Sequence, residues 1–496
     1  MKRRILPLTI VALSSLFCLS CSDFLKERPV TFVSPENFYL TGEQIEQATL
    51  GCYVQIRPGL FENYGAPGCE PYFLYERLTG NVETAHGLGA NVGLPIATNN
   101  ADTDIMWHYY YSAIENCNGT IAGIENTTAI IDETLKSRDL AEVYFLRAYY
   151  YFNLVRFFGP VPYKTTPTTG VEGAALPCDS EETIYNGIVS DLKKAESLFP
   201  ATDPVAVTNG RAGIGATKSL LSKVYLTMAG YPLQKEECYQ LAYEKALEVV
   251  SSGAYQLFGS HEEWRNSTKT STRGENIFSV QCDANNATSY LHRSLLPYPV
   301  TVPAIGSGQE YGGHMLPTQH FYDAFEDGDE RKTAYFYTSY PSLDDPGVTV
   351  SFSRPYIYKF FDEGALSNGK SGLRFPIIRY ADVLLTLAEA ACAGGSTTDP
   401  AALKAFTDVR SRAVKGFSAS SITADQVLCE RFYELCFEGQ NWYDMIRTRK
   451  AFNPASRQMV DTMGYKAETC PSPYDESYLY APYPDRDYAL NPNLKR

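Results

Sequence analysis

The residues best suited to chemistry in this chain are aromatic and polar side chains in segments that lack a helical repeat. Residues 72–108 and 284–314 supply both kinds in runs that no helix face explains. A rigid ring covers the apolar C–H face of a sugar, while amides and carboxylates bind its hydroxyl groups. The candidate stacking residues are Phe73, Tyr290, Tyr298 and Tyr311, and the candidate polar contacts are Asn81, Glu83, Asn99, Asn285 and His292. This mixture favours a binding site over a catalytic centre.

Catalytic and metal chemistry find little support. The six histidines are scattered, and the pattern H-E-x-x-H is absent, so we expect no catalytic metal. The acidic run 323–330 lacks the spacing of a calcium-binding EF-hand loop, which favours a solvated turn. Glu434 and Glu438 could resemble the carboxylate pair of a glycosidase, but we expect Arg431 to pair with Glu434 along one helix instead. We therefore predict no catalytic residue and no cofactor.

Composition indicates a large globular protein that does not bind nucleic acid. The chain has 496 residues and a formal net charge of −14, whereas phosphate binding requires clustered Lys and Arg. Tyrosine is abundant at 37 residues, and it suits both helix packing and sugar faces. Most of the 12 cysteines are expected to be small core residues, with one or two disulfides left open.

The elements that must position the candidate residues are amphipathic helices. Apolar residues recur at steps of three and four in residues 41–56, 104–252 and 376–449, which predicts a mainly α-helical scaffold with helix pairs of the tetratricopeptide kind. Trp107 is assigned to that core. The remaining residues, 57–103, 255–374 and 450–496, form a loop-rich irregular half with a few short strands.

Two long helices are predicted near the C-terminus. The first should begin with Pro376 in its first turn and continue until Gly394. The second should run without a break from Leu428 to Ile446, with one apolar stripe and a charged back.

Residues 1–21 read as a targeting segment. Lys2, Arg3 and Arg4 precede an apolar stretch that ends in Cys18-Leu-Ser-Cys21, which is similar to a bacterial lipoprotein cleavage site. Lipid on Cys21 would tether the mature chain, residues 22–496, to a membrane without spanning it. The alternative is an ordinary secretory signal that is cleaved elsewhere.

Several long motifs together resemble one known family. AEVYFLRAYYYFNLVRFFGPVPY, the acidic turn FEDGDERK, PIIRYADVLLTLAEA and ERFYELCFEGQNWYDMIR occur in the order typical of the SusD/RagB family of outer-membrane nutrient-binding lipoproteins. The resemblance implies one domain over residues 22–496, anchored on the outer membrane through Cys21 and facing the cell exterior. It also implies a partner, a SusC-like TonB-dependent transporter, and a glycan or peptide ligand.

The expectation is therefore a non-catalytic surface protein that captures an oligosaccharide or polysaccharide and delivers it to the transporter. Two alternatives stay open. One, within binding, is the capture of peptides; the other, from another class, is a helical scaffold that assembles a complex without binding a nutrient. An enzyme ranks third. The sequence names neither the ligand nor the partner.

Overall fold

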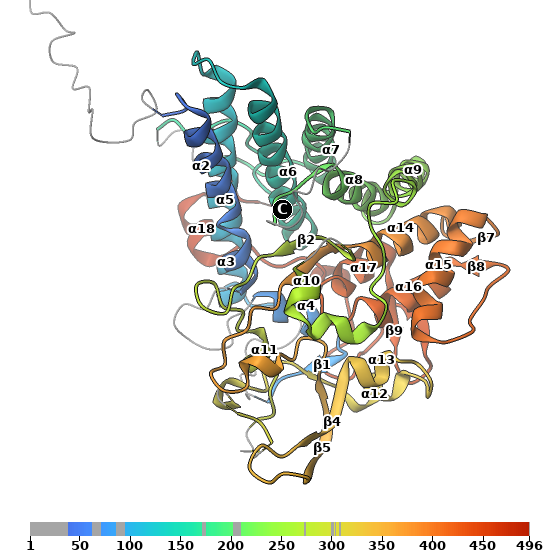
Figure 1. Ribbon diagram of the computed structural model, residues 1–496. Coiled ribbons are helices and arrows are strands. Elements are labelled where there is room, and N and C mark those ends of the chain that lie inside the picture. Colours follow the sequence, from blue (N-terminus) through green and yellow to red (C-terminus); the bar gives the residue numbers. More distant parts are fainter. Residues whose placement is uncertain are drawn as a thin grey trace, which may run out of the picture.

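The helices form a continuous scaffold, and the irregular segments are mounted on one side of it (Figure 1). The computed structural model describes residues 38–61, 71–85, 95–170, 175–201, 210–271, 274–298, 302, 304–306 and 309–495. The lipidation prediction at Cys21 lies outside these residues. The longer helices are α2 (Gly42–Tyr53), α5 (Ala101–Asn126), α6 (Glu133–Phe158), α7 (Glu181–Leu198), α8 (Ile214–Ala229), α9 (Glu237–Ser251), α14 (Tyr380–Cys392), α15 (Pro400–Ala413), α16 (Ala424–Glu434) and α17 (Asn441–Thr448).

The mainly α-helical prediction is confirmed. Helices α5 to α9 pack each against the next, and α9 then packs against α14, which packs against α15. Residues 252–379 are inserted between α9 and α14, so most of the irregular half is one excursion from the helical array. One hydrophobic cluster extends from Ile45 to Leu494 and includes the buried Trp107, as predicted.

Local signals in the sequence set several helix ends. Thr41 forms a capping box with Gln44 at the start of α2, and Gly159 ends α6 with φ = 73°, a backbone conformation that glycine adopts readily. Helix α5 begins three residues earlier than predicted, because the Asn100 side chain accepts from the Thr103 backbone N–H and caps it.

Two of the C-terminal helix predictions are wrong in part. Residues Phe375–Arg379 form strand β6, which pairs antiparallel with β2 (Asn276–Val280), so Pro376 lies in a strand and α14 begins only at Tyr380. The helix predicted from Leu428 to Ile446 is broken into α16 and α17, because Phe437 and Gly439 both have positive φ.

The segment 57–103 is also more helical than predicted. It contains α3 (Ile56–Phe61) and α4 (Pro71–Leu78), and every residue of α4 is buried. A helix that is covered on all sides has no polar face, so it leaves no amphipathic repeat in the sequence.

The irregular half carries short elements, as predicted. Its strands pair antiparallel, β1 with β3, β4 with β5 and β9 with β10, as does the scaffold pair β7 with β8. The elements are β1 (Val82–Glu83), α10 (Ser267–Thr270), α11 (Leu291–Ser294), β3 (Leu316–Pro317), α12 (Gln319–Ala324), α13 (Arg331–Ala334), β4 (Phe336–Pro341), β5 (Thr349–Ile357), β7 (Ser396–Thr397), β8 (Ile422–Thr423), β9 (Lys450–Asn453), β10 (Gln458–Asp461) and α18 (Asp485–Leu490).

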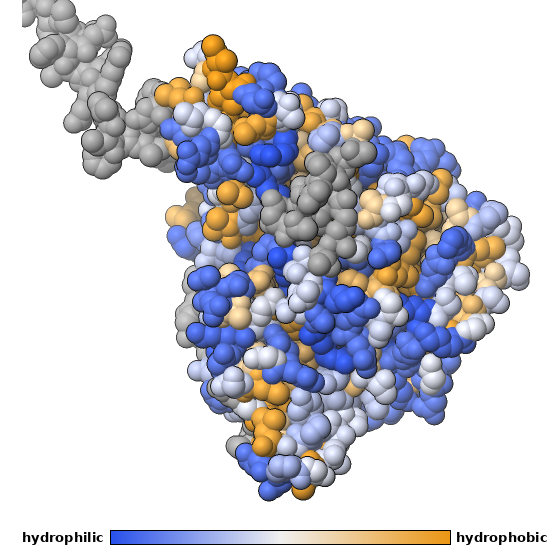
Figure 2. All heavy atoms as spheres, viewed as in Figure 1, coloured by the Kyte–Doolittle hydropathy of each residue, from blue (hydrophilic) through white to orange (hydrophobic). Residues whose placement is uncertain are grey.

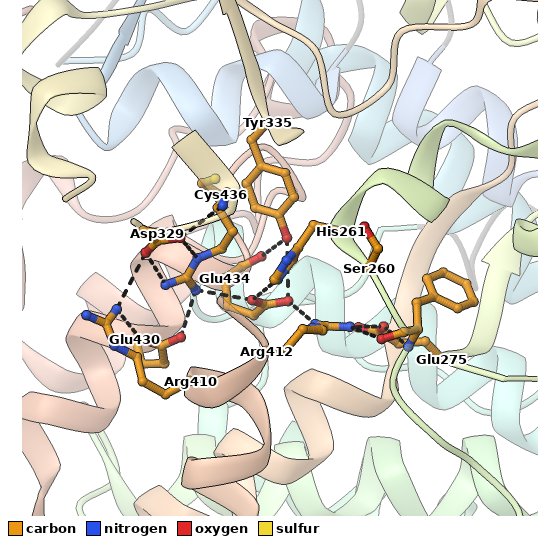
Figure 3. Close-up of polar contacts among 12 residues, drawn as sticks. Ser260, His261, Glu275, Asp329, Tyr335, Arg410, Arg412, Glu430, Glu434 and Cys436 are labelled. Atoms are coloured by element: carbon orange, nitrogen blue, oxygen red, sulfur yellow. Dashed lines mark hydrogen bonds and ion pairs between the residues drawn. The ribbon is translucent and has the colours of Figure 1, made fainter. Parts of the chain in front are cut away.

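A buried network of ion pairs joins the irregular half to the scaffold (Figure 3). The carboxylate of Glu434 in α16 accepts hydrogen bonds from Arg379 at 2.8 Å and Arg412 at 2.6 Å. Two residues of the irregular half contact the same carboxylate. Arg331 donates to it at 3.1 Å, and the His261 Nε2 lies 3.2 Å from it. These side chains are nearly or fully buried, so the network fixes how the two halves sit on each other.

A second network links the scaffold helices to one another, and it corrects the predicted Arg431–Glu434 pair. Arg431 instead contacts Asp382 of α14 and Asp444 of α17, each at 2.8 Å. Both residues of the predicted pair are completely buried and contact different neighbours, so neither lies on a charged outer face of α16. In the acidic turn, Asp329 is likewise buried and paired with Arg331 at 2.8 Å, while Asp323 and Asp327 are exposed as predicted.

Each cysteine that the structure describes is a free thiol, and most are buried. This agrees with the prediction that they act as small core residues. Along the described part of the chain, no helix is long and apolar enough to cross a membrane.

Glu76 in α4 is a buried carboxyl group whose hydrogen-bond donors are backbone N–H groups and not a cationic side chain. Its carboxylate is 2% exposed and accepts from the Gly439 backbone N–H at 2.7 Å. Desolvation raises its pKa to about 7, so the folded state favours the protonated form, and the stability that this group contributes is lost as pH rises from about 4.5 to 7.

We therefore expect Glu76→Gln to gain stability relative to the wild type by about 3 kcal/mol between pH 4 and pH 8. Urea unfolding followed by circular dichroism at unit pH steps measures the difference. Glu244→Gln, at an exposed position on α9, is the control and should give a flat difference. A flat difference for Glu76→Gln would mean that Glu76 is ionised in the folded protein at low pH.

Candidate ligand-binding site

The candidate site lies where three segments of the irregular half are tied together by backbone hydrogen bonds. Ala85 N–H donates to the Gly313 carbonyl at 2.8 Å, and Gly313 N–H donates to the Leu296 carbonyl at 2.8 Å. Gly313 has φ = +75°, and a Cβ at this position would lie 2.9 Å from atoms of both Ala85 and Tyr298. Only glycine permits so close an approach.

This frame rests on a small hydrophobic cluster of its own. The cluster comprises buried residues from the segments 296–305 and 316, the hairpin β4–β5 and the segment that follows it. Its buried members are Leu296, Val302, Ala304, Ile305, Leu316, Tyr337, Tyr356 and Phe361. The loops that carry the candidate residues are therefore held from below by packed side chains.

Two of the predicted ligand residues lie against one arginine, and a third follows close by in the chain. The Arg293 guanidinium lies 4.2 Å from the ring centroid of Tyr290 and 4.2 Å from that of Tyr311. Tyr290 is 39% exposed, Tyr311 is half-buried, and Tyr298 follows α11 at half-buried depth beside Gly313. The result is an aromatic and cationic surface in the irregular half, near α11 in Figure 1.

Sequence reasoning missed Arg293, although a signal was present. Tyr290 and Arg293 are three residues apart, a spacing that places both on one face of a helical turn. The sequence analysis predicted the neighbouring His292 instead.

Three predicted ligand residues are buried, so their assignment to ligand contact is corrected. Phe73 is fully buried on α4 and stacks on His314 with ring centroids 6.1 Å apart. Asn81 is 4% exposed, and its backbone carbonyl accepts a hydrogen bond from the Thr318 backbone N–H. Both side chains pack in the interior beneath the candidate site.

His292 is the third buried residue. Its Nδ1 accepts from the Asp362 backbone N–H at 3.0 Å, and its ring meets Phe361 edge to face. Desolvation lowers the pKa of His292 to about 4, so the ring is neutral at physiological pH. Its role is to hold the segment around Asp362 against α11.

The three remaining polar candidates are accessible but do not converge with the tyrosines. Glu83 is half-buried and forms an ion pair with Arg354 of β5. Asn285 is exposed on a turn where its backbone N–H donates to Asp283, and Asn99 is exposed just before the cap of α5.

A separate hollow of about 540 Å³ lies between α5, residues 162–168 and 175–176, and α18. Its volume suits a small ligand, but aliphatic side chains such as Ile114, Leu176 and Leu490 supply much of its wall. Polar side chains such as Glu115, Lys164 and Asp487 line it as well. The tyrosine–arginine surface is chosen as the candidate site because it carries an exposed ring, that of Tyr290.

Comparison with known proteins identifies the family. A sequence model described as the SusD family matches residues 332–496, and one described as "Starch-binding associating with outer membrane" matches residues 90–226. A SusD-like protein of Bacteroides ovatus is 28% identical over 477 residues, which cover 88% of this chain and 82% of that relative.

Solved structures agree with these matches. A SusD superfamily protein from Parabacteroides distasonis is 31% identical with a TM-score of 0.82, covering 91% of this chain and 98% of that one. Another structure, described as "with xylogluco-oligosaccharide", has a TM-score of 0.74 at 22% identity and covers 91% of this chain and 98% of its own. The fold and the motifs together define a class of helical outer-membrane-associated proteins. The chain belongs to the SusD/RagB family.

Proposed function

We propose that this protein captures an oligosaccharide or polysaccharide at the cell surface without chemical conversion. The observation that carries the proposal is the exposed Tyr290 ring beside Arg293 and Tyr311 in the irregular half. Rings with a clamped guanidinium between them offer a stacking face and hydrogen-bond donors at fixed positions. Relatives described as binding glycans support this choice of ligand.

The binding role is also supported by the state of the carboxylates that resemble a glycosidase pair. Glu434 is fully buried, and Arg412 and Arg379 hold its pKa well below the ordinary range. A general acid needs a raised pKa and access to the substrate. Glu438 is likewise buried and paired with Lys359 and Arg379.

The proposed anchoring and the proposed transporter partner rest on membership of the family and on the targeting segment, residues 1–21. We infer that lipid on Cys21 anchors the single domain 22–496 to the outer membrane, facing the exterior. There it would deliver the glycan to a SusC-like TonB-dependent transporter. Capture of peptides, as implied for RagB, is the alternative ligand class.

The test is titration calorimetry of the chain from Ser22 onward, which includes every residue that the structure describes. Neutral and acidic polysaccharides and a peptide digest form the panel. We expect saturable binding of a glycan, and Tyr290→Ala should weaken it about tenfold, since a stacked ring contributes on the order of 1 kcal/mol.

Tyr231→Ala is the matched control, because Tyr231 is also 39% exposed and also lies under an arginine, Arg449 at 4.7 Å. The control should bind as the wild type does. Binding of peptides alone would favour the peptide alternative. Binding of neither class would contradict the proposal and favour a scaffold without a nutrient ligand.

A further inference from the structure

Three arginines of the candidate region have no carboxylate partner among the described residues. Within the described ranges of the chain, the contacts of Arg293 are those with the two rings, and its buried Nε has no hydrogen-bond acceptor there. Arg57 donates to the Thr288 carbonyl at 2.6 Å, and Arg374 donates to the Ser271 carbonyl at 3.0 Å. All three side chains are half-buried rather than covered.

Arg293 belongs to the segment 282–293 and Arg57 contacts it, while Arg374 lies within electrostatic reach of its first residue, Cys282. Arg57 contacts Thr288, two residues before Tyr290, whose ring lies under Arg293. Arg57 and Arg374 are both close enough to Cys282 to oppose the effect of burial, which raises the pKa of that thiol to about 11. Two guanidinium groups, those of Arg293 and Arg57, therefore contact the short segment that carries the exposed tyrosine.

The neighbouring acids are engaged elsewhere. Asp283 accepts from the backbone N–H groups of Asn285 and Asn286 at 3.0 and 2.9 Å. Asp362 accepts from the Ser371 hydroxyl at 2.7 Å and from the Gly364 N–H at 2.9 Å. Glu310 is exposed next to Tyr311, and no ion pair joins it to Arg293 in the described part of the chain.

This arrangement differs from that of the buried arginines. In the two networks each guanidinium is neutralised by carboxylates, for example Arg379 by Glu275 at 2.6 Å and by Glu438 at 2.7 Å. Charged groups half withdrawn from water without a partner are costly, and that cost is recovered when an anion binds. The planar fork of arginine matches the two oxygens of a carboxylate or a sulfate.

We propose that Arg293, with Arg57 and Arg374, selects glycans that carry carboxylate or sulfate groups. The ligand class is an anionic polysaccharide, whose sugar ring stacks on Tyr290 while its anionic substituent binds the arginines. The two rings hold the Arg293 guanidinium in one plane, so little side-chain freedom is lost on binding. This inference rests on the proposed function, because it specifies the ligand of the same site.

The experiment compares matched pairs of probes by titration calorimetry with the chain from Ser22 onward. One pair is hexagalacturonate and its methyl ester, and the other is a sulfated galactan oligosaccharide and its desulfated form. Neutral xyloglucan and malto-oligosaccharides complete the panel. We expect the anionic member of one pair to bind at least tenfold more tightly than its neutralised partner, and which pair shows this separates carboxylate from sulfate.

Variants then assign the preference to the arginines. Arg293→Gln should abolish most of the difference within the pair, and Arg293→Lys should restore part of it, because the charge returns without the planar fork. Lys193→Gln removes one charge at an exposed position on α7 and should leave both affinities unchanged. Unchanged thermal midpoints would exclude misfolding of the variants.

The possible failures are distinguishable. Equal binding of both members of each pair, or an equal loss for both in Arg293→Gln, would overturn the preference for anions and leave glycan capture intact. Selective binding of the neutral oligosaccharides would do the same. Absence of binding to every glycan would overturn both proposals.

Discussion

Replacing Glu434 by glutamine should lower the free energy of unfolding by about 3 to 5 kcal/mol, although the two side chains have the same shape. Glu434 accepts from Arg331, Arg379 and Arg412 and is completely buried. The amide would place N–H donors against guanidinium donors and would remove the charge that neutralises them. Buried cations left without a counter-charge are among the most destabilising defects in a protein interior.

The measurement is urea unfolding at pH 7, followed by circular dichroism and by tyrosine fluorescence. The matched control is Glu244→Gln on the exposed face of α9, which should change the free energy of unfolding by no more than about 0.5 kcal/mol. A loss below about 1 kcal/mol for Glu434→Gln would mean that water enters the network or that its arginines find other acceptors. It would contradict the view that this network holds the two halves together.

The helical scaffold was predictable because its signals are local. The cap Thr41, the stop at Gly159 and the apolar repeat of α7 each act over a few residues. The repeat fails where an element is covered on every side, as α4 is. It also fails where the apolar repeat continues across a backbone turn, as it does at Gly439 between α16 and α17.

The ion networks could not be predicted, because their partners are far apart in the sequence. Arg431 and Glu434 suggested a local pair, yet Arg431 is bound to Asp382, 49 positions away. The charged residues of the motifs that resemble SusD/RagB sequences therefore stabilise buried contacts between helices and between the two halves. In these motifs the charges serve the fold.

The candidate site was predictable in its location and only partly in its members. The loop tyrosines Tyr290 and Tyr311 do lie together, but no local pattern showed that Phe73 and His292 face inward. Burial in a loop depends on which distant segment covers it, here Asp362 over His292. In a segment without a periodic apolar pattern, the sequence does not show which residues a distant segment will cover.

Acid should destabilise the protein steeply below about pH 4, by roughly 5 kcal/mol between pH 5 and pH 3. Arginine or lysine partners hold the pKa values of five buried carboxylates below their ordinary range, against the opposing effect of desolvation. They are Glu275, Asp329, Asp382, Glu434 and Asp444.

The sign follows from the two states. A carboxyl group whose pKa is lower in the folded protein contributes stability that is complete above its unfolded pKa, near 4, and is lost as pH falls toward its folded pKa. Each such group then costs about 1.4 kcal/mol per pH unit, and five together approach the whole stability of a domain. His292 acts in the same direction between pH 6.5 and 4, because its folded pKa of about 4 is also lowered.

Urea titrations at pH 5, 4 and 3 measure this loss, and Glu434→Gln is the informative comparison. That variant begins less stable at pH 5 but should lose about 1 kcal/mol less than the wild type down to pH 3, since one of the five carboxylates is gone. Glu244→Gln should follow the wild-type curve, because its carboxylate is exposed. Equal acid slopes for wild type and Glu434→Gln would mean that Glu434 is not the ionised centre of the network. In that case the large effect of the same substitution at pH 7 would have to come from lost hydrogen bonds rather than from charge.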